Sequence, residues 1–243
     1  QRTTAEKKDG HYVLNGVKNW ITNGNSASVY LVMAQADPSK KSKGINTFIV
    51  EKNWPGISVG AKENKLGIRG SDTHSVSFND VMVPSENLLG EEGGGFKFAM
   101  QTLAGGRIGI ASQALGIASG SYDLAIRYAR DRKAFGKEIM HHQAIQFKLA
   151  DMLTRINASR LLCFKAAWQK DQSQDYGLSS SMAKVFASET AMYASIEAVQ
   201  IHGGYGYVKE YHVERLMRDA KITQIYEGTS EVQRMVIGRS ILA

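Results

Sequence analysis

Cysteine and proline are scarce in this chain of 243 residues. Cys163 is the only cysteine, so no disulfide can form within the chain, and its apolar neighbours predict a buried, unreactive thiol. Three prolines stand against 24 glycines. The longest apolar runs are far shorter than the roughly 20 residues that a membrane-spanning helix needs, so we expect no membrane span. An apolar fraction of 43% and a charged fraction of 22% are typical of a globular protein with a buried core.

Several motifs of nucleotide, hydrolytic and metal chemistry are also missing. The chain has neither a Walker-type P-loop nor a G-x-S-x-G nucleophile elbow. The glycine-rich stretch 203–208 follows an expected helix instead of a strand, which excludes a Rossmann fingerprint. His141 and His142 are adjacent and point in different directions, and His202 and His212 have no carboxylate or cysteine at ligand spacing. We therefore expect no metal site.

Basic residues outnumber acidic ones, giving a net charge of +7 and an isoelectric point near 9.4. This balance permits binding to nucleic acid, to an acidic membrane face or to a phosphorylated small ligand. The basic residues are spread over the chain, without a long Lys/Arg run or an aromatic-interleaved RNA-binding signature. We therefore favour a phosphorylated small molecule and expect no nucleic-acid partner.

The chain changes character near Pro84. Residues 1–90 consist of short apolar segments separated by turns, which predicts a small antiparallel β-sandwich or barrel domain. Asn15-Gly16 lies between two apolar runs and predicts a hairpin turn. Further strands are expected over 45–52, 56–62 and 74–84, and in the last of them Val76 and Phe78, then Val81 and Val83, recur at a period of two.

Residues 91–243 have helical periodicity and predict a four-helix up-down bundle, making the whole chain an α+β multidomain protein. Ile145, Leu149, Met152 and Ile156 fall on one face of the second helix. Gly203-Gly204 is expected to end the third helix. Ser230 and Gln233 fit an S-x-x-Q capping box at the start of the fourth.

The stretch ITQIYEGTSEVQRM holds Glu227 between Tyr226 and Gly228, upstream of that expected cap. The cap does not need Glu227, so two readings stay open on these residues alone: an ordinary solvated turn residue, or a catalytic base. Glu227 and the scattered Arg, Gln, Trp and Thr residues cannot carry redox chemistry by themselves. Redox activity would therefore require a cofactor.

Five stretches in order along the chain, NWITNG, NKLGIRGSDTHSVSFNDVMVP, YARDRKAFGKEI, QIHGGYGYVKEYHVERLMRDAKI and IYEGTSEVQR, resemble the acyl-CoA dehydrogenases. MQTLAGGRIGIASQALGIA is especially similar to the short-chain (butyryl-CoA) branch. The resemblance implies an FAD-dependent enzyme that oxidises acyl-CoA thioesters to trans-2-enoyl-CoA. In this reading Glu227 abstracts the α proton and flavin N5 accepts the β hydride. The family's alternative position for the base corresponds to Gly106, where no carboxylate competes.

The resemblance also implies roles for other residues. Arg107, Tyr226 and Gly228 would lie on the acyl-CoA side, although Ala104 replaces an aspartate that is usual three residues before the arginine. The FAD-binding residues would be Trp20, Ile21, Thr22, Arg132, Phe135, Gln143, Gln200, Ile201, His202, Gly203, Gly204, Thr229, Ser230 and Glu231. Of these, Arg132, Phe135, Gln143 and Gln200–Gly204 would reach the cofactor of a neighbouring subunit.

These roles imply a homo-oligomer, with a tetramer expected, and an electron-transferring flavoprotein as the electron acceptor. The resemblance further implies the bacterial cytoplasm, or the mitochondrial matrix of a eukaryote, as the expected compartment. Family members carry an all-helical domain ahead of the part that corresponds to residue 1, and these 243 residues do not include it, so the fragment could be inactive. An acyl-CoA oxidase, a branch of another chain length and a non-catalytic oligomerisation module remain the alternatives.

Overall fold

The computed structural model describes residues 2–242 and divides into two compact units. The first unit comprises the residues up to Lys65 and Arg69–Thr102. The second comprises Leu66–Ile68 and the residues from Leu103 onward. The division falls inside one long helix, α1 (Gly95–Asp131). The predicted order, with strands first and helices afterwards, is confirmed.

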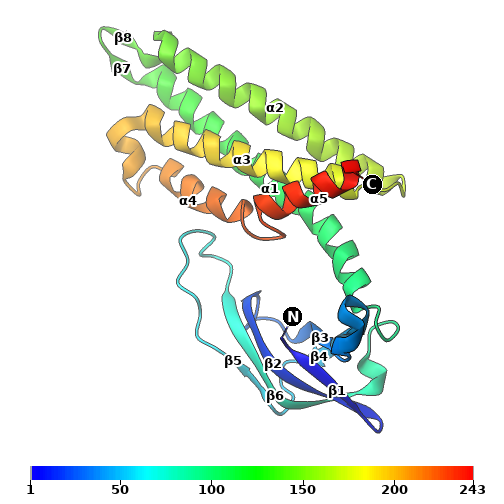
Figure 1. Ribbon diagram of the computed structural model, residues 1–243. Helices are drawn as coiled ribbons and strands as arrows, with labels where there is room; N and C mark the ends of the chain where they lie inside the picture. The colour runs from blue at the N-terminus through cyan, green and yellow to red at the C-terminus, as the bar shows by residue number, and fades with distance from the viewer. Residues whose placement is uncertain (1, 243) are drawn as a thin grey trace. The chain divides into compact units, whose positions relative to one another are not determined.

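The first unit is built on one six-stranded sheet with the order β4-β3-β1-β2-β6-β5 (Figure 1). Its strands are β1 (Thr4–Lys8), β2 (His11–Thr22), β3 (Val29–Gln35), β4 (Ile45–Glu51), β5 (Ile57–Val59) and β6 (Thr73–Pro84). The pairs are antiparallel as expected, except that β1 and β3 run parallel. Tyr12, Leu14, Phe48 and Val50 form part of a fully covered core.

The hairpin predicted at Asn15-Gly16 is wrong. Residues 11–22 form a single strand, and the hairpin between β1 and β2 turns at Asp9-Gly10 instead. The register of β2 against β6 shifts between Leu14 and Gly16. Asn15 holds this bulge, because its side-chain amide donates to Asp80 Oδ1 and its side-chain oxygen accepts from the Asp80 N–H, both at 2.9 Å. A bulge uses the same conformational freedom of glycine as a turn, and Gly16 has φ of 139°.

The same bulge explains an interruption in the alternation along β6. Val76, Phe78, Val81 and Val83 are all buried as predicted, although two residues instead of one lie between Phe78 and Val81. Strict alternation would have turned Val81 to the opposite face. The extra residue, with Asp80 at φ 48°, restores both ends of the strand to the core face.

Within the described residues, the second unit contains most of α1 and four further α-helices: α2 (Gln143–Asp171), α3 (Gly177–His202), α4 (Val213–Thr223) and α5 (Ser230–Leu242). Figure 1 shows α1, α2 and α3 running alongside one another. Their contact faces are rich in small residues, with Ala114, Ala118, Ala187 and Ala191 completely buried, which lets the helices approach closely. Met152 and Ile156 are buried on α2 and Cys163 joins the same core, as predicted.

Two features of the helical unit differ from expectation or add to it. Helix α4 is an extra short helix beyond the four that were predicted. It carries the ion pairs Arg215–Asp219 and Arg218–Glu214, each spanning one turn. Helix α3 ends at Gly203, which has φ of 58° and whose N–H donates to Gln200 O, so the glycine C-cap is confirmed. The residues between α3 and α4 include a 3-10 turn, Gly203–Tyr207.

Leu66–Ile68 pack against α4. The Ile68 N–H donates to Asp219 Oδ1 at 2.6 Å, and Arg218 donates to Leu66 O at 3.0 Å. A Cβ on Gly67 would lie 2.5 Å from Arg218 O, so only glycine allows this approach.

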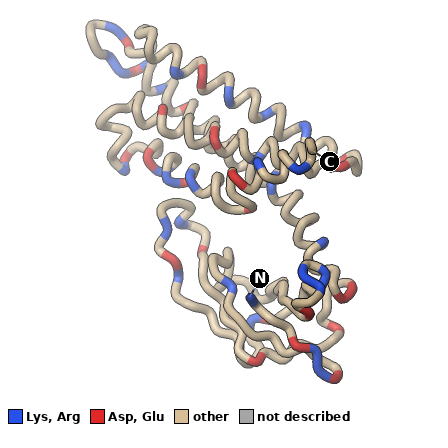
Figure 2. Tube along the Cα trace, viewed as in Figure 1, with Lys and Arg blue, Asp and Glu red and all other residues tan. Residues whose placement is uncertain are grey.

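No helix within residues 2–242 is long and apolar enough to cross a membrane. Lysine and arginine occur over both units and form no continuous basic stripe along the trace in Figure 2.

Candidate functional site

Glu227 lies in the loop that joins α4 to α5, and its backbone is unusual. Glu227 and Gly228 are consecutive residues with positive φ, 54° and 89°. A left-handed conformation costs a non-glycine residue roughly 1–2 kcal/mol, so the surrounding contacts must hold it in place. The side chain is half-buried.

Gln233 provides one of these contacts. Its buried side-chain amide donates to Glu227 O at 3.0 Å and to Gly228 O at 2.9 Å. The predicted capping box is therefore wrong, because Gln233 binds the preceding turn rather than the Ser230 N–H. The cap of α5 is Thr229, whose hydroxyl accepts from the Val232 N–H. Ser230 instead directs its N–H to Gln224 O.

The Glu227 carboxylate lies against α1 at Gly106. A Cβ built on Gly106 would stand 2.5 Å from Glu227 Oε2 and 3.1 Å from Cδ, closer than real Cβ atoms come. Glycine at this position therefore leaves the space in which the carboxylate sits. The sequence indicated that no carboxylate competes at residue 106, and the structure adds that no side chain fits there without displacing Glu227.

Arg107 and Tyr226 complete the surroundings of the carboxylate. Arg107 is buried and donates to Ser181 Oγ on α3 at 3.2 Å, while its Nε has no hydrogen-bond partner among the described residues. Burial lowers the pKa of Arg107, and the negative charge of Glu227 opposes that shift. The Tyr226 hydroxyl donates to Gln113 Oε1 on α1. Burial, as the main cause, raises the pKa of Tyr226.

Lys184 on α3 is a member of this site that the sequence reasoning missed. Its side chain is fully covered, and its Nζ donates to Gly228 O at 2.7 Å. The sequence feature that could have indicated Lys184 is its position as the single cation within the serine- and alanine-rich stretch SSSMAKVFASET. Burial is the main cause that lowers the pKa of Lys184 to about 8, opposed by the charge of Glu227.

Several of the predicted cofactor residues meet around an open hollow of about 500 Å³ in the helical unit. Arg132, Ile201, His202, Gly203 and Gly204 contribute to its lining, together with Tyr128 and Tyr205. The His202 ring stacks on Tyr128 with 4.2 Å between centroids, and its Nδ1 lies 2.7 Å from Ala198 O. Burial lowers the pKa of His202, favouring the neutral ring.

Two more predicted residues lie between the end of α1 and the first turn of α2. Phe135 is 96% exposed, has φ of 51° and meets only the edge of the His142 ring at 6.0 Å among the ring contacts of the described chain. Gln143, at the start of α2, is also exposed, and so is Gln200 at the end of α3. A large aromatic side chain held in the open by a constrained turn is suited to contact with a second molecule.

The N-terminus of α5 lines a second, smaller hollow of about 180 Å³. Thr229, Ser230 and Glu231 contribute to it with Lys221 and Arg234. The Ser230 hydroxyl is buried there without a partner in the described part of the chain. Hydrogen bonds from its own backbone N–H and from Thr229 lower the pKa of Glu231. Unused N–H groups at a helix start favour an anion.

Trp20, Ile21 and Thr22 lie at the end of β2, in the other unit. Trp20 has φ of 61° and is 72% exposed, at a second register shift between Lys18 and Ile21. Thr22 is exposed and pairs with Thr73. The indole is therefore exposed rather than part of the sheet core.

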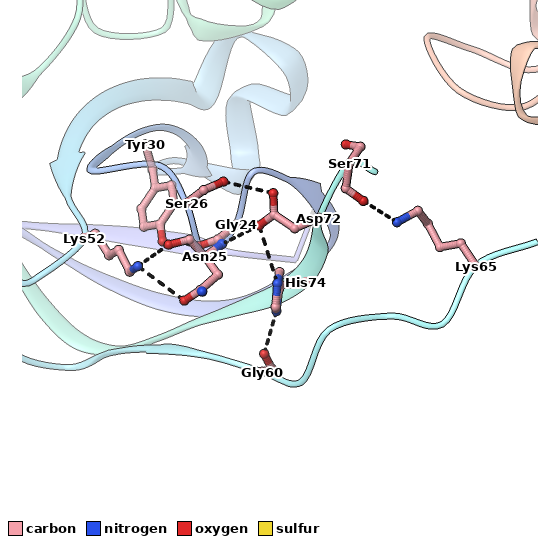
Figure 3. A network of polar contacts seen from close by, with 10 residues as sticks. All are labelled: Gly24, Asn25, Ser26, Tyr30, Lys52, Gly60, Lys65, Ser71, Asp72 and His74. Atoms are coloured by element: carbon pink, nitrogen blue, oxygen red, sulfur yellow. Dashed lines mark hydrogen bonds and ion pairs between the residues drawn. The ribbon is translucent and has the colours of Figure 1, made fainter. Parts of the chain in front are cut away.

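A polar network fixes the loop that follows Thr22 (Figure 3). Asp72 accepts hydrogen bonds from the Ser26 hydroxyl at 2.9 Å and the Asn25 N–H at 3.2 Å, and it lies 3.5 Å from His74 Nε2. His74 Nδ1 lies 2.8 Å from Gly60 O. Lys52, which directly follows β4, donates from its Nζ to Asn25 O. The hydrogen bond from Ser26 is the largest cause that lowers the pKa of Asp72.

No group of three or more histidine, cysteine, aspartate or glutamate side chains is placed to hold a metal ion within residues 2–242.

The sequences of both parts of the chain match a known protein family. Residues 1–81 match the acyl-CoA dehydrogenase middle domain, and residues 93–242 match the acyl-CoA dehydrogenase C-terminal domain. The chain belongs to the acyl-CoA dehydrogenase family. The short-chain specific acyl-CoA dehydrogenase of Megasphaera elsdenii is 54% identical over 243 residues, covering 100% of this chain.

Solved structures agree with this assignment. Butyryl-CoA dehydrogenase from Megasphaera elsdenii superposes on 100% of this chain with a TM-score of 0.98 and 53% identity. A chain from work on the electron transferring flavoprotein of Acidaminococcus fermentans superposes with a TM-score of 0.97 and 51% identity, again over 100% of this chain. The chain spans 64% of each of these solved chains and 63% of the Megasphaera elsdenii relative.

Proposed function

We propose that this chain provides the base and much of the cofactor site of a flavin-dependent acyl-CoA dehydrogenase that acts on short-chain acyl-CoA thioesters. The observation that carries the proposal is the Glu227 carboxylate, placed in the space that Gly106 leaves open, on a turn fixed by Gln233 and Lys184. The identities to short-chain and butyryl-CoA dehydrogenases support the substrate class.

The proposed reaction removes two hydrogens from neighbouring carbons. Glu227 takes the α proton as the Cα–H bond breaks, and the electron pair forms the new Cα=Cβ bond while hydride leaves Cβ. Bound FAD supplies the acceptor of that hydride. A half-buried carboxylate on a constrained turn suits proton abstraction, because a positioned base contributes roughly 10²–10⁴-fold in rate. The Glu227 N–H belongs to the same turn, so its direction is fixed with the carboxylate.

The residues of the chain fit FAD at two places. At the start of α5, the unpartnered buried hydroxyl of Ser230 and the helix N-terminal amides suit a pyrophosphate oxygen. At the larger hollow, Arg132 with Ile201–Gly204 suits the cofactor of a second subunit, with Phe135, Gln143 and Gln200 exposed nearby in sequence. Arginine binds a pyrophosphate through two parallel hydrogen bonds. Trp20, Ile21 and Thr22 would cover the flavin ring.

An assembly of several copies follows from the same proposal, with a tetramer expected. Helix α2 exposes Phe147, Leu161, Phe164 and Trp168, each at least 56% accessible. Apolar side chains at this spacing on one helix favour burial against another chain. We further propose an electron-transferring flavoprotein as the acceptor, and the bacterial cytoplasm or the mitochondrial matrix as the compartment.

The replacement Glu227→Gln in the complete protein tests the proposal. Glutamine keeps the size of the side chain but cannot accept a proton near pH 7. We expect short-chain acyl-CoA to bleach the flavin of the wild type. In the variant, the rate of bleaching should fall by roughly 10²–10⁴-fold or more. FAD content and acyl-CoA affinity should be retained. Glu210→Gln, an exposed glutamate outside the site, is the control.

Bleaching of the Glu227→Gln variant at the wild-type rate would move the base elsewhere. Absence of bound flavin in the wild type would favour a non-catalytic module. Rapid reoxidation of the reduced flavin in air would favour an oxidase, and a series of acyl-CoA lengths tests the short-chain assignment.

A further inference from the structure

Lys184 is a fully buried lysine in the helical unit. It is 0% exposed, and its buried polar neighbours within one turn of the helix are the small Ser180, Ser181 and Ser188. Removing an ammonium group from water is strongly unfavourable unless it gains good partners. A methionine would fill a similar volume without that cost. Packing alone therefore does not explain a lysine here.

The hydrogen bond of Lys184 points to a reason. Its Nζ donates to the carbonyl oxygen of Gly228, the residue directly after the proposed base. Gln233 donates to the same oxygen and to Glu227 O, so side chains from α3 and α5 hold the turn from two helices. Both carbonyl groups of the positive-φ pair thus have side-chain donors, which is how a strained backbone persists.

Charges around Lys184 lead in the same direction. The groups that act on its ammonium are Glu227 on the turn and Glu231 on α5, which attract it, and Arg107 on α1, which repels it. The pKa of Lys184, lowered to about 8, leaves it mostly protonated at pH 7. Lys184 therefore acts on the turn through a charge-assisted hydrogen bond as well as through its attraction to Glu227.

We propose that Lys184 is a positioning residue for the dehydrogenation, holding the Glu227–Gly228 turn in the one conformation that presents the carboxylate beside Gly106. The inference rests on the proposed function of Glu227. Lys184 touches neither of the reacting carbons and acts through the backbone of its neighbour. Losing it leaves the base present but poorly aimed, and a misplacement near 1 Å can cost roughly 10²-fold in rate.

The experiment compares Lys184→Met and Lys184→Gln with the wild type in the complete, FAD-loaded protein. Methionine removes the charge and the donor, whereas glutamine keeps a polar donor of shorter reach. Ser188→Ala is the matched control, because Ser188 is equally buried one turn along the same helix and bonds only within it, to Val185 O. The measurements are kcat, KM, the isotope effect with α-deuterated butyryl-CoA, and hydrogen exchange of residues 222–235.

We expect Lys184→Met to lower kcat by roughly 10–10²-fold with little change in KM, as for lost alignment in the transition state. The isotope effect should rise because proton abstraction becomes more rate-limiting. Residues 222–235 should exchange faster, Lys184→Gln should fall between, and Ser188→Ala should match the wild type. A loss of structure alone would not raise the isotope effect.

Unchanged kcat, isotope effect and exchange in both variants would overturn the inference. If Lys184→Met fails to fold, Lys184→Gln decides by the same measurements. Hydrogen exchange does not depend on turnover, so it tests the inference even if the wild type fails to oxidise acyl-CoA. That failure would overturn the proposed function, and hydrogen exchange would still show whether Lys184 holds the Glu227–Gly228 turn.

Discussion

Gly106 and Glu227 share one small space, since a Cβ on residue 106 would lie 2.5 Å from Oε2 of the carboxylate. The two residues are 121 positions apart in sequence, on α1 and on the turn before α5. The absence of a side chain at one position therefore determines where the carboxylate of the other can be. This relationship gives a direct test of whether the position of the carboxylate matters.

Gly106→Ala is expected to displace the carboxylate without removing it. A shift of several tenths of an ångström to 1 Å should slow flavin reduction by acyl-CoA by roughly 10–10²-fold. Gly109→Ala is the control, because it lies on the same helix and its Cβ would meet nothing within 4 Å. That control should stabilise the helix by roughly 0.5–1 kcal/mol and keep full activity. Equal rates for both variants would contradict the prediction.

Lys184→Met should change how stability depends on alkaline pH. Folding lowers the pKa of Lys184 from 10.5 to about 8. Between these values the unfolded chain binds more protons than the folded chain, so the free energy of unfolding of the wild type rises with pH. In thermal melts from pH 7 to pH 10, the Tm of the wild type should therefore rise relative to the Tm of Lys184→Met. A constant difference in Tm over that range would mean that the ammonium is not buried in the protein.

Asp72→Asn should loosen the loop after Thr22. The native carboxylate accepts hydrogen bonds from Ser26 and Asn25, and its lowered pKa means that its contribution is complete above the unfolded pKa near 3.9. That contribution is lost as pH falls through the lower, folded pKa. The variant should melt below the wild type at pH 7, and the gap should close below about pH 4. Asp123→Asn, exposed on α1, is the control.

The exposed face of α2 gives a prediction about assembly. Leu161 is 71% and Phe164 64% accessible, on adjacent turns of the helix. Two carboxylates there would have to be buried unpaired in an interface, so Leu161→Glu/Phe164→Glu should dissociate the assembly into smaller species. Light scattering after size exclusion measures the mass. Lys165→Glu, at a neighbouring position that is already polar, should leave it unchanged. A wild type that is a monomer with FAD fully bound would remove the assembly proposal.

Sequence patterns were reliable wherever one short segment decides its own structure. Alternation placed Val76 and Val83 in the sheet core, and the 3.6-residue period placed Met152 and Ile156 in the helical core. Gly203 ended α3 because a positive φ is open to glycine at little cost. The motif resemblance also identified the family, because it depends on residues in order along the chain.

Tertiary structure decided the cases in which a residue has two possible partners. Asn15-Gly16 fits a hairpin turn and a bulge equally well, and the partner strand with Asp80 selected the bulge. Gln233 could have capped Ser230, but the carbonyls of Glu227 and Gly228 were within its reach. Lys184 and Gly106 became parts of the site only because α1, α3 and the turn before α5 meet in space. No local pattern encodes that meeting, since it depends on how buried faces far apart in sequence pack together.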